Sequence, residues 1–293
     1  MAGQLKEVRN RIKSIQNTQQ ITKAMKMVSA AKLRRAQDAI IQMRPYATKL
    51  QELLSNIVSN SDGEMGMSLA AERTVEKVLL IVITSDRGLA GAYNANIIKL
   101  AKQTIRENYS AQAAKKNVTI WSIGKKGYEH FAKNNFQVSD SYKDILISIK
   151  FANVQACALA AMRAFENKEF DTVQLVYSEF KNAATQRFVV EKFLPIPKVE
   201  KRAGASNSDF IFEPDRETLI AELMPKILNT QLFKAVLDAN ASEHGARMTA
   251  MDKASDNANE LLKSLRLSYN RARQAAITTE LTEIVSGAAA LQG

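Results

Sequence analysis

Several residue types that would fix a class of function are scarce in this chain of 293 residues. It has a single cysteine, Cys157, so no disulfide can form within the chain. This fits a protein in a reducing compartment, or one whose fold needs no disulfide bond. Two histidines and one cysteine cannot supply the ligands of a His/Cys zinc site. We therefore expect neither a disulfide scaffold nor a zinc centre.

Long apolar runs and aromatic side chains are also lacking. No run of about 18 apolar residues occurs, so we expect no segment that spans a bilayer. The first residues are charged from Lys6 and contain no apolar stretch typical of a secretory signal. Aromatic residues make up 6% of the chain and the first of them is Tyr46. The basic N-terminal stretch thus has no rings to stack on unpaired bases, which argues against single-stranded nucleic acid.

Positive charge is abundant. The chain has 41 lysines and arginines against 30 aspartates and glutamates, a net charge of +11. In the first 35 residues the only acid is Glu7, whereas the basic residues are Lys6, Arg9, Arg11, Lys13, Lys23, Lys26, Lys32, Arg34 and Arg35. Such a run could bind phosphates or the acidic side chains of a protein partner. It could also be a helix face that is simply exposed to solvent. The excess of one sign favours an acidic partner.

Both ends of the chain have apolar residues at alternating steps of four and three, the spacing of a coiled-coil seam. In the first zone, residues 1–60, they are Leu5, Val8, Ile12, Ile15, Ala36, Ile40, Met43, Ala47, Leu50, Leu54 and Ile57. In the last zone, residues 213–293, they are Ala254, Ala258, Leu261, Leu265, Ser268, Ala272 and Ala275. Pro45 is expected to kink or break the first helix, and Pro225 to kink the last.

The middle zone, residues 70–212, alternates strand and helix patterns, which predicts an α/β layer with a partly parallel sheet. The expected strands are 75–86, 117–124, 170–180 and 185–196, the last two as a hairpin. Helices are expected near 91–109, 125–134 and 151–168. The stretch 198–209 has the composition of a surface loop. The simplest assembly is an α/β domain from which the two terminal helices rise as an antiparallel coiled coil. Because most of such a rod would be exposed to solvent, we expect it to bind to, or be surrounded by, a larger protein partner.

The turn "TSDRGLAGAYN" (84–94) joins a strand to a helix, where α/β proteins bind phosphates. Its glycines, Gly88 and Gly91, match neither the dinucleotide pattern nor the P-loop pattern. We therefore favour a tight turn with a local ion pair between Asp86 and Arg87 over a nucleotide site. "SIGKKG" (122–127) is a second turn of this kind.

Candidate catalytic residues are few. His130 and His244 have no serine or cysteine nucleophile near them in the sequence, and Cys157 lies in an alanine-rich helical stretch. We expect these three side chains to be structural, with Cys157 packed as a small apolar residue. The sequence therefore predicts no active site, no metal and no cofactor.

Four segments of the chain are distinctive: "IKSIQNTQQITKAMKMVSAAKLRRAQ" (12–37), "TSDRGLAGAYN" (84–94), "ASEHGARMTAMDKASDNANELL" (241–262) and "YNRARQAAITTELTEIVSGAAAL" (269–291). Together they resemble one known family, the gamma subunit of F-type ATP synthase of the bacterial type. The spacing of the family signature is carried by Ile277, Thr278, Glu280, Glu283, Gly287 and Ala288. The chain departs from the common pattern at Ala90, Ala92 and Gly245, which concerns local packing.

The resemblance implies a fold in which the N- and C-terminal helices form an antiparallel coiled coil beside a central Rossmann-like α/β domain. It also implies the central rotor shaft of ATP synthase. Such a shaft turns inside a ring of alpha and beta subunits, with its base and the delta/epsilon subunit on the membrane c-ring. ATP chemistry belongs to beta, so this chain would be non-catalytic, without cofactor or nucleic acid. We expect it at the cytoplasmic side of the bacterial plasma membrane, as a peripheral protein.

The resemblance further implies contacts with the beta subunit. The matching positions are Arg273, Gln274, Thr278, Glu280, Thr282, Glu283 and Met25. Charge complementarity to an acidic segment of beta adds Lys23, Lys26, Arg34 and Arg35. The small residues 287–291 would turn in an apolar sleeve. Two other classes remain open from the residues alone: a coiled-coil protein that binds duplex nucleic acid, and an α/β nucleotide enzyme.

Overall fold

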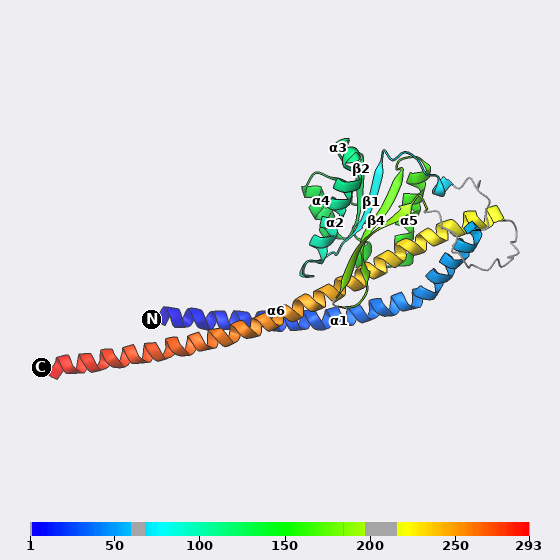
Figure 1. Ribbon diagram of the computed structural model, residues 1–293. Coiled ribbons are helices and arrows are strands. Elements are labelled where there is room, and N and C mark those ends of the chain that lie inside the picture. The colour runs from blue at the N-terminus through cyan, green and yellow to red at the C-terminus, as the bar shows by residue number, and fades with distance from the viewer. Residues whose placement is uncertain (1, 60–67, 184, 197–215, 293) are drawn as a thin grey trace. The chain divides into compact units, whose positions relative to one another are not determined.

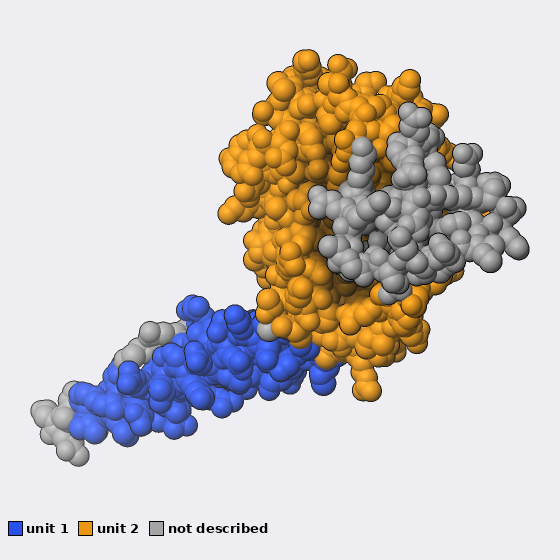
Figure 2. Space-filling model, turned by 45° about the vertical axis from the view of Figure 1, so that its right-hand side comes forward, with its two compact units in different colours: residues 1–29, 248–293 blue, residues 30–247 orange. Residues whose placement is uncertain are grey.

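The structure, a computed structural model, describes residues 2–59, 68–183, 185–196 and 216–292. The chain divides into two compact units, which Figure 2 colours separately: residues 1–29 with 248–293, and residues 30–247. Two long helices, α1 (Ala2–Ser59) and α6 (Arg216–Gln292), contribute residues to both units. The loop predicted at 198–209 lies outside the described residues.

In the first unit the two long helices pair in an antiparallel manner, as predicted. Residue numbers rise along α1 while those of the contacting residues fall along α6 (Figure 1). The contacting pairs are Arg9 with Tyr269, Gln19 with Asn259, Thr22 with Ser255, and Lys26 with Asp252. This geometry confirms the paired terminal helices.

The predicted seam of α1 is confirmed at the positions that the structure describes. Leu5, Val8, Ile12 and Ile15 are half-buried in the first unit. In the second unit Ala36 and Leu50 are buried, and Ile40 and Met43 are half-buried. The side chains of Ala47, Leu54 and Ile57 lie outside the described part. Between the apolar stretches the seam continues through polar residues, with Thr22 and Ser29 buried.

The predicted seam of α6 is wrong at three of its seven positions, Leu261, Ser268 and Ala275. Leu261 is 39% exposed, whereas its neighbour Leu262 is only 5% exposed. Likewise Ser268 and Ala275 are exposed, while Tyr269 and Ala276 are half-buried. Two rows of residues satisfy steps of four and three: the predicted row through Leu261, Ser268 and Ala275, and the observed row through Leu262, Tyr269 and Ala276. Both rows contain Ala258, Leu265 and Ala272. Small alanine side chains do not distinguish the two phases, which is why the sequence pattern misplaced the seam.

The prolines do not break the long helices. Helix α1 continues through Pro45, and α6 continues through Pro225. Of the kink or break expected at Pro45, the break does not occur, and Figure 1 shows that the second half of α1 curves. A proline removes one backbone hydrogen bond and strains one turn. In helices of 58 and 77 residues, the remaining hydrogen bonds and the buried faces outweigh that loss.

The second unit contains a five-stranded sheet with the order β3-β2-β1-β4-β5. Its strands are β1 (Val78–Ile83), β2 (Val118–Ile123), β3 (Gln137–Ser139), β4 (Thr172–Phe180) and β5 (Gln186–Leu194). The first four are parallel, and β5 pairs with β4 in the antiparallel direction. The partly parallel sheet and its final hairpin are confirmed. The three-residue strand β3 was not predicted.

Helices cover both faces of the sheet, as Figure 1 shows for α2, α4 and α5. All six residues of β1, "VLLIVI", are buried, as in other central parallel strands. Leu79, Ile81 and Ile83 pack with α5 and α6, whereas Val78, Leu80 and Val82 pack with α2 and α4. The helix bounds are α2 (Tyr93–Asn108), α3 (Ser110–Ala114), α4 (Lys125–Lys133) and α5 (Phe151–Glu166), with short 3-10 turns at Ser68–Ala70 and Ile145–Ile147.

Two small residues are explained by this packing. Cys157 is fully buried between α5 and the sheet, and burial raises the pKa of its thiol far above the usual range, which confirms its apolar role. At Gly245 an added Cβ would lie 3.1 Å from the carbonyl oxygen of Ala183. The glycine thus lets the turn between β4 and β5 approach α6 closely.

Candidate functional site

Polar contacts fix how the two helices of the first unit are aligned. The hydroxyls of Thr22 and Ser255 lie 2.7 Å apart in the buried seam. The ammonium of Lys26 is 2.5 Å from the carboxylate of Asp252, and Gln19 donates to Asn259. An apolar seam that is rich in alanine is compatible with several alignments, whereas each polar pair is satisfied in only one. These pairs therefore specify the register of the coiled coil.

The guanidinium of Arg9 lies at the far end of this pairing. It donates a hydrogen bond of 2.9 Å to the hydroxyl of Tyr269 and also lies over the tyrosine ring. Ala2 lies seven positions before Arg9 (9 − 2 = 7), so in an antiparallel pair it lies opposite residue 276 (269 + 7 = 276). Residues 277–292 of α6 consequently have no described residue of α1 opposite them.

Six of the predicted partner-binding residues lie on or just before this extension of α6, and all are exposed. They are Arg273, Gln274, Thr278, Glu280, Thr282 and Glu283. The two threonine hydroxyls donate to carbonyls one turn earlier on their own helix, at 2.9 and 2.8 Å. Within the described residues, the side chains of Arg273, Gln274, Glu280 and Glu283 make no hydrogen bond or ion pair. These four side chains are available to a partner.

An apolar row accompanies the polar residues on the extension. Ile277, Leu281, Ile284 and Val285 follow steps of four, three and one, and all are exposed, Ile284 by 67%. Steps of this size place side chains along one face of a helix. A contiguous exposed apolar face is typical of a surface that contacts another protein. The sequence analysis did not single out this row.

The predicted partner-binding residues of α1 differ from one another. Lys23 is exposed without an ion pair in the described part of the chain, and Met25 is half-buried. Lys26 is paired with Asp252, so its charge is partly neutralised within the chain. Arg34 and Arg35 belong to the second unit and are exposed.

The predicted ion pair between Asp86 and Arg87 is wrong. Instead, the carboxylate of Asp86 accepts a hydrogen bond of 3.2 Å from the backbone N–H of Lys125, at the start of α4. The next N–H groups of that helix are also occupied: Lys126 donates to the carbonyl of Ser85 at 3.0 Å, and Gly127 to the hydroxyl of Thr84 at 2.8 Å. A phosphate at the start of α4 would need these same donors. At the second turn, 122–127, they are already occupied by Thr84, Ser85 and Asp86 of the first turn, which supports a structural role for the two turns.

A buried arginine fixes the other side of this turn. The guanidinium of Arg247 on α6 is 2.6 Å from the carboxylate of Glu243. It also donates to the carbonyl of Arg87 at 2.9 Å and to that of Gly88 at 3.3 Å. We call this group of contacts the Arg247 latch. These contacts were not predicted, although a glutamate four residues before an arginine on a helix is a recognisable signal.

The two histidines lie outside any catalytic arrangement. Burial, followed by the charges of Arg247 and Lys32, lowers the pKa of His244 to about 4. Burial, followed by the charge of Lys102, lowers the pKa of His130. Neither ring contacts a serine or cysteine side chain within the described residues. Across the described ranges, no three His, Cys, Asp or Glu residues are grouped to hold a metal ion, and no helix is long and apolar enough to cross a membrane.

Comparison with known proteins covers almost the whole chain. A family model described as ATP synthase matches residues 4–291. The ATP synthase gamma chain of Flavobacterium johnsoniae is 51% identical over 289 residues, with 99% of both chains covered. The chain belongs to the ATP synthase gamma-chain family. The gamma chain of Cytophaga hutchinsonii is 50% identical over 290 residues, with 98% of each chain covered.

Solved structures share the gamma-chain fold. The rotor of the Euglena gracilis mitochondrial ATP synthase is similar with a TM-score of 0.65, 21% identity, and coverage of 94% of this chain and 100% of that one. The central stalk of the Tetrahymena thermophila enzyme gives a TM-score of 0.56, 24% identity, and coverage of 80% and 99%. These likenesses confirm the fold class: long terminal helices with a central mixed sheet.

Proposed function

We propose that this chain is the central rotor shaft of an F-type ATP synthase and transmits rotation between the membrane c-ring and the catalytic beta subunits. The observation that carries the proposal is the extension of α6, a helix with exposed apolar and charged residues that no described residue of α1 covers. The sequence identity of 51% to a gamma chain, over 99% of this chain, supports the same role. In this role residues 1–60 and 213–293 form the shaft and residues 70–212 the globular base.

A shaft of this kind acts through unequal contacts. The extension is a single helix with an apolar row on one face, so it presents different side chains to each of three surrounding beta subunits. A partner can shift a conformational equilibrium only by its difference in affinity for the two states. As the shaft turns, the beta subunit that meets the apolar row changes. This difference couples rotation to the state of each nucleotide site.

The chemistry of ATP would belong to the beta subunits, with this chain as a non-catalytic subunit without a cofactor. The occupied N–H groups at the start of α4 support this division of labour. The other proposed partners are the alpha and delta/epsilon subunits and the c-ring. Through them the chain would be peripheral to the plasma membrane of a bacterium, on its cytoplasmic side.

We assign the contacts with beta to three groups of residues. Behind the tip, Arg273 and Gln274 can form directional hydrogen bonds, and a guanidinium can hold a carboxylate with two of them. Thr278, Glu280, Thr282 and Glu283 continue this polar surface. On α1 the group is Met25, Lys23, Lys26, Arg34 and Arg35, in which Lys26 can reach an acidic partner only by sharing or leaving Asp252.

Co-expression tests the proposal directly. The full chain with an affinity tag is produced together with the alpha and beta subunits of its own organism, and the purified material is assayed for ATP hydrolysis. We expect alpha and beta to co-purify as an ATPase that is not recovered when the tagged chain is omitted. Recovery of the tagged chain without either subunit, under conditions in which alpha and beta are soluble, contradicts the rotor role.

Arg273→Ala is expected to weaken binding to the alpha–beta assembly by about 1–2 kcal/mol, a five- to thirtyfold loss of affinity. The reason is that an exposed guanidinium without a partner in the described chain loses only its contacts with beta. Titration of the variant into alpha and beta, followed by ATP hydrolysis, measures the change. Arg271→Ala is the matched control, since Arg271 is exposed on the same helix and has no predicted contact.

Circular dichroism distinguishes a variant that binds weakly because a contact with beta is lost from one that binds weakly because it is unfolded. The Arg273→Ala chain should unfold at the same urea concentration as the parent. A clear drop in its stability would instead make Arg273 a structural residue. Equal losses for Arg271→Ala and Arg273→Ala would point to general electrostatic attraction and remove the specific role.

A further inference from the structure

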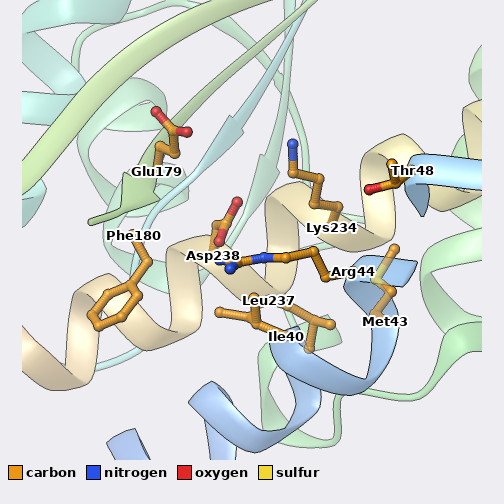
Figure 3. Close-up of a pocket in the computed structure, with 9 residues that line it drawn as sticks. All are labelled: Ile40, Met43, Arg44, Thr48, Glu179, Phe180, Lys234, Leu237 and Asp238. Carbon is orange, nitrogen blue, oxygen red and sulfur yellow. The ribbon is translucent and has the colours of Figure 1, made fainter. Parts of the chain in front are cut away.

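A pocket of about 210 Å³ lies within the second unit, between the middle of α1, the end of β4 and α6 (Figure 3). Helix α1 lines one side of it with Ile40, Met43, Arg44 and Thr48. The other lining residues are Glu179 and Phe180 of β4 and Lys234, Leu237 and Asp238 of α6. We call this contact of α1 with β4 and α6 the α1 seat. Because α1 forms a wall of the pocket, any separation of α1 from α6 opens the pocket to solvent.

The α1 seat buries the carboxylate of Asp238. This residue is only 5% exposed, and its carboxylate forms no hydrogen bond and no ion pair with another described residue. Figure 3 shows Arg44 extending from α1 toward Asp238. Lys234, one helical turn before Asp238 on α6, also acts on it through its charge. A carboxylate that is removed from water without a bonded partner raises the free energy of the folded chain. The α1 seat is therefore weakened as long as Asp238 is charged.

The other charges around Asp238 do not remove this cost. Arg44 and Lys234 are exposed to solvent, which screens their attraction for the carboxylate. On the strands, Glu179 of β4 and Glu191 of β5 are anions that repel it. Both anions have partners of their own: Lys181 and Arg187 lie 3.8 and 3.6 Å from Glu179, and Tyr177 and Gln231 each donate a hydrogen bond of 2.7 Å to Glu191.

We propose that Asp238 makes the α1 seat a proton-sensitive joint: when its carboxylate takes up a proton, α1 binds more firmly to α6 and β4. With Asp238 charged, the packing of α1 acts against the cost of the buried charge. With Asp238 neutral, most of that cost disappears, because a carboxyl group is far less unfavourable to bury than a carboxylate. The joint does not require the rotor role. In a rotor shaft it would set how rigidly α1 is attached to the unit of residues 30–247.

The direction of the effect follows from the pKa of Asp238. Burial raises this pKa from 3.8 to about 6, because it outweighs the attraction of Lys234 and Arg44 and is reinforced by repulsion from Glu179 and Glu191. When the seat is open, the hydrated carboxylate has its ordinary pKa. The formed seat thus binds the proton more readily than the open one. By linkage, the seat is weakest above pH 6 and gains stability as the pH falls from about 6 toward 3.8.

Hydrogen exchange of residues 36–44 of α1, measured by mass spectrometry on the full chain, tests the joint. A helical segment that leaves its packing partners frays, and its amides then exchange. After division by the intrinsic exchange rates at each pH, we expect opening at pH 5 to be about tenfold rarer than at pH 7.5. The reason is that protonated Asp238 outnumbers charged Asp238 by about ten to one at pH 5 when the seat is formed, but is the minor form when the seat is open.

Asp238→Asn imitates the protonated form. We expect residues 36–44 of this variant to open at pH 7.5 about tenfold less often than those of the parent, with no further decrease at pH 5. Asp256→Asn, which changes an exposed aspartate of the same helix, is the matched control and should keep the pH dependence of the parent. Arg44→Met removes a cation that opposes the rise in the pKa of Asp238, so its pH dependence should be larger than that of the parent.

Other titrating groups would give a different pattern. His244, with a pKa of about 4, and Glu243, with a raised pKa, are still present in Asp238→Asn. A pH dependence that persists in this variant therefore assigns the effect to such groups and overturns the joint. More frequent opening of the parent at pH 5 than at pH 7.5 overturns it as well, since the charged carboxylate would then hold α1 in place.

Urea unfolding at pH 7.5 provides a second measurement. Asp238→Asn removes a buried charge, so we expect it to unfold at the same urea concentration as the parent or at a higher one. A clear drop would mean that the charge stabilises the seat, and the proposal fails. None of these results affects the rotor role, because the pocket shares no residue with the surfaces assigned to beta.

Discussion

Replacing Arg247 with alanine is expected to lower the free energy of unfolding of the unit of residues 30–247 by about 3–5 kcal/mol. The substitution leaves the carboxylate of Glu243 buried without its cation and removes the donors to the carbonyls of Arg87 and Gly88. Burial already raises the pKa of Glu243, against the lowering effect of Arg247, so loss of the guanidinium should raise it further. Urea unfolding followed by the fluorescence of Trp121, the only tryptophan, measures the loss.

Two further variants separate the Arg247 latch from a general effect of charge. Arg266→Ala removes an exposed arginine of the same helix and should change the stability by less than about 0.5 kcal/mol. The double variant Glu243→Leu with Arg247→Met should recover much of the loss, since replacing both members of a buried pair by apolar residues leaves no uncompensated charge. If Arg247→Ala alone were as stable as the parent, water would have to replace the guanidinium as the partner of Glu243.

Most of the central sheet could be predicted because its signal is local. The six apolar residues of β1 are consecutive, and all are buried between helices. The run that forms β2 and the alternation that forms β4 and β5 are local patterns as well, although several of their residues are only half-buried. A strand such as β3, with three residues of which only two are half-buried, carries too little apolar pattern to stand out.

The Arg247 latch could not be predicted, because its members are distant in the chain. Arg247 meets the carbonyl of Arg87 across 160 residues. The pocket that brings Asp238 of α6 together with Arg44 of α1 and Glu179 of β4 could not be predicted for the same reason (Figure 3). Nothing in the order of residues states that these segments meet. The partner-binding residues on α6 came from resemblance instead, and their contacts with beta stay a prediction.

The phase of the α6 seam shows a different limit. Rows of residues through Leu261 and through Leu262 both satisfy the spacing of a coiled coil, so periodicity alone allowed either. The polar pairs decide between them, since Ser255 and Tyr269, which meet Thr22 and Arg9, belong to the row that contains Leu262. A helix rich in alanine is placed by a few specific contacts rather than by its apolar pattern.

The adjacent leucines allow a sharp test of this register. Leu262→Ala should cost roughly 2–5 kcal/mol, because its buried side chain leaves a cavity in the paired helices. Leu261→Ala should cost clearly less, about 1 kcal/mol, since 39% of that residue is exposed. Both variants change the same residue type on the same turn, so helix propensity is matched.

Hydrogen exchange measures this difference where it arises. Amides of residues 250–270 open by local separation of the two helices, and their exchange reports the free energy of that opening. We expect exchange at least about thirtyfold faster in Leu262→Ala, which corresponds to about 2 kcal/mol, and only about fivefold faster in Leu261→Ala. The opposite order would restore the row through Leu261 and would place a different face of α6 toward the partners of the shaft.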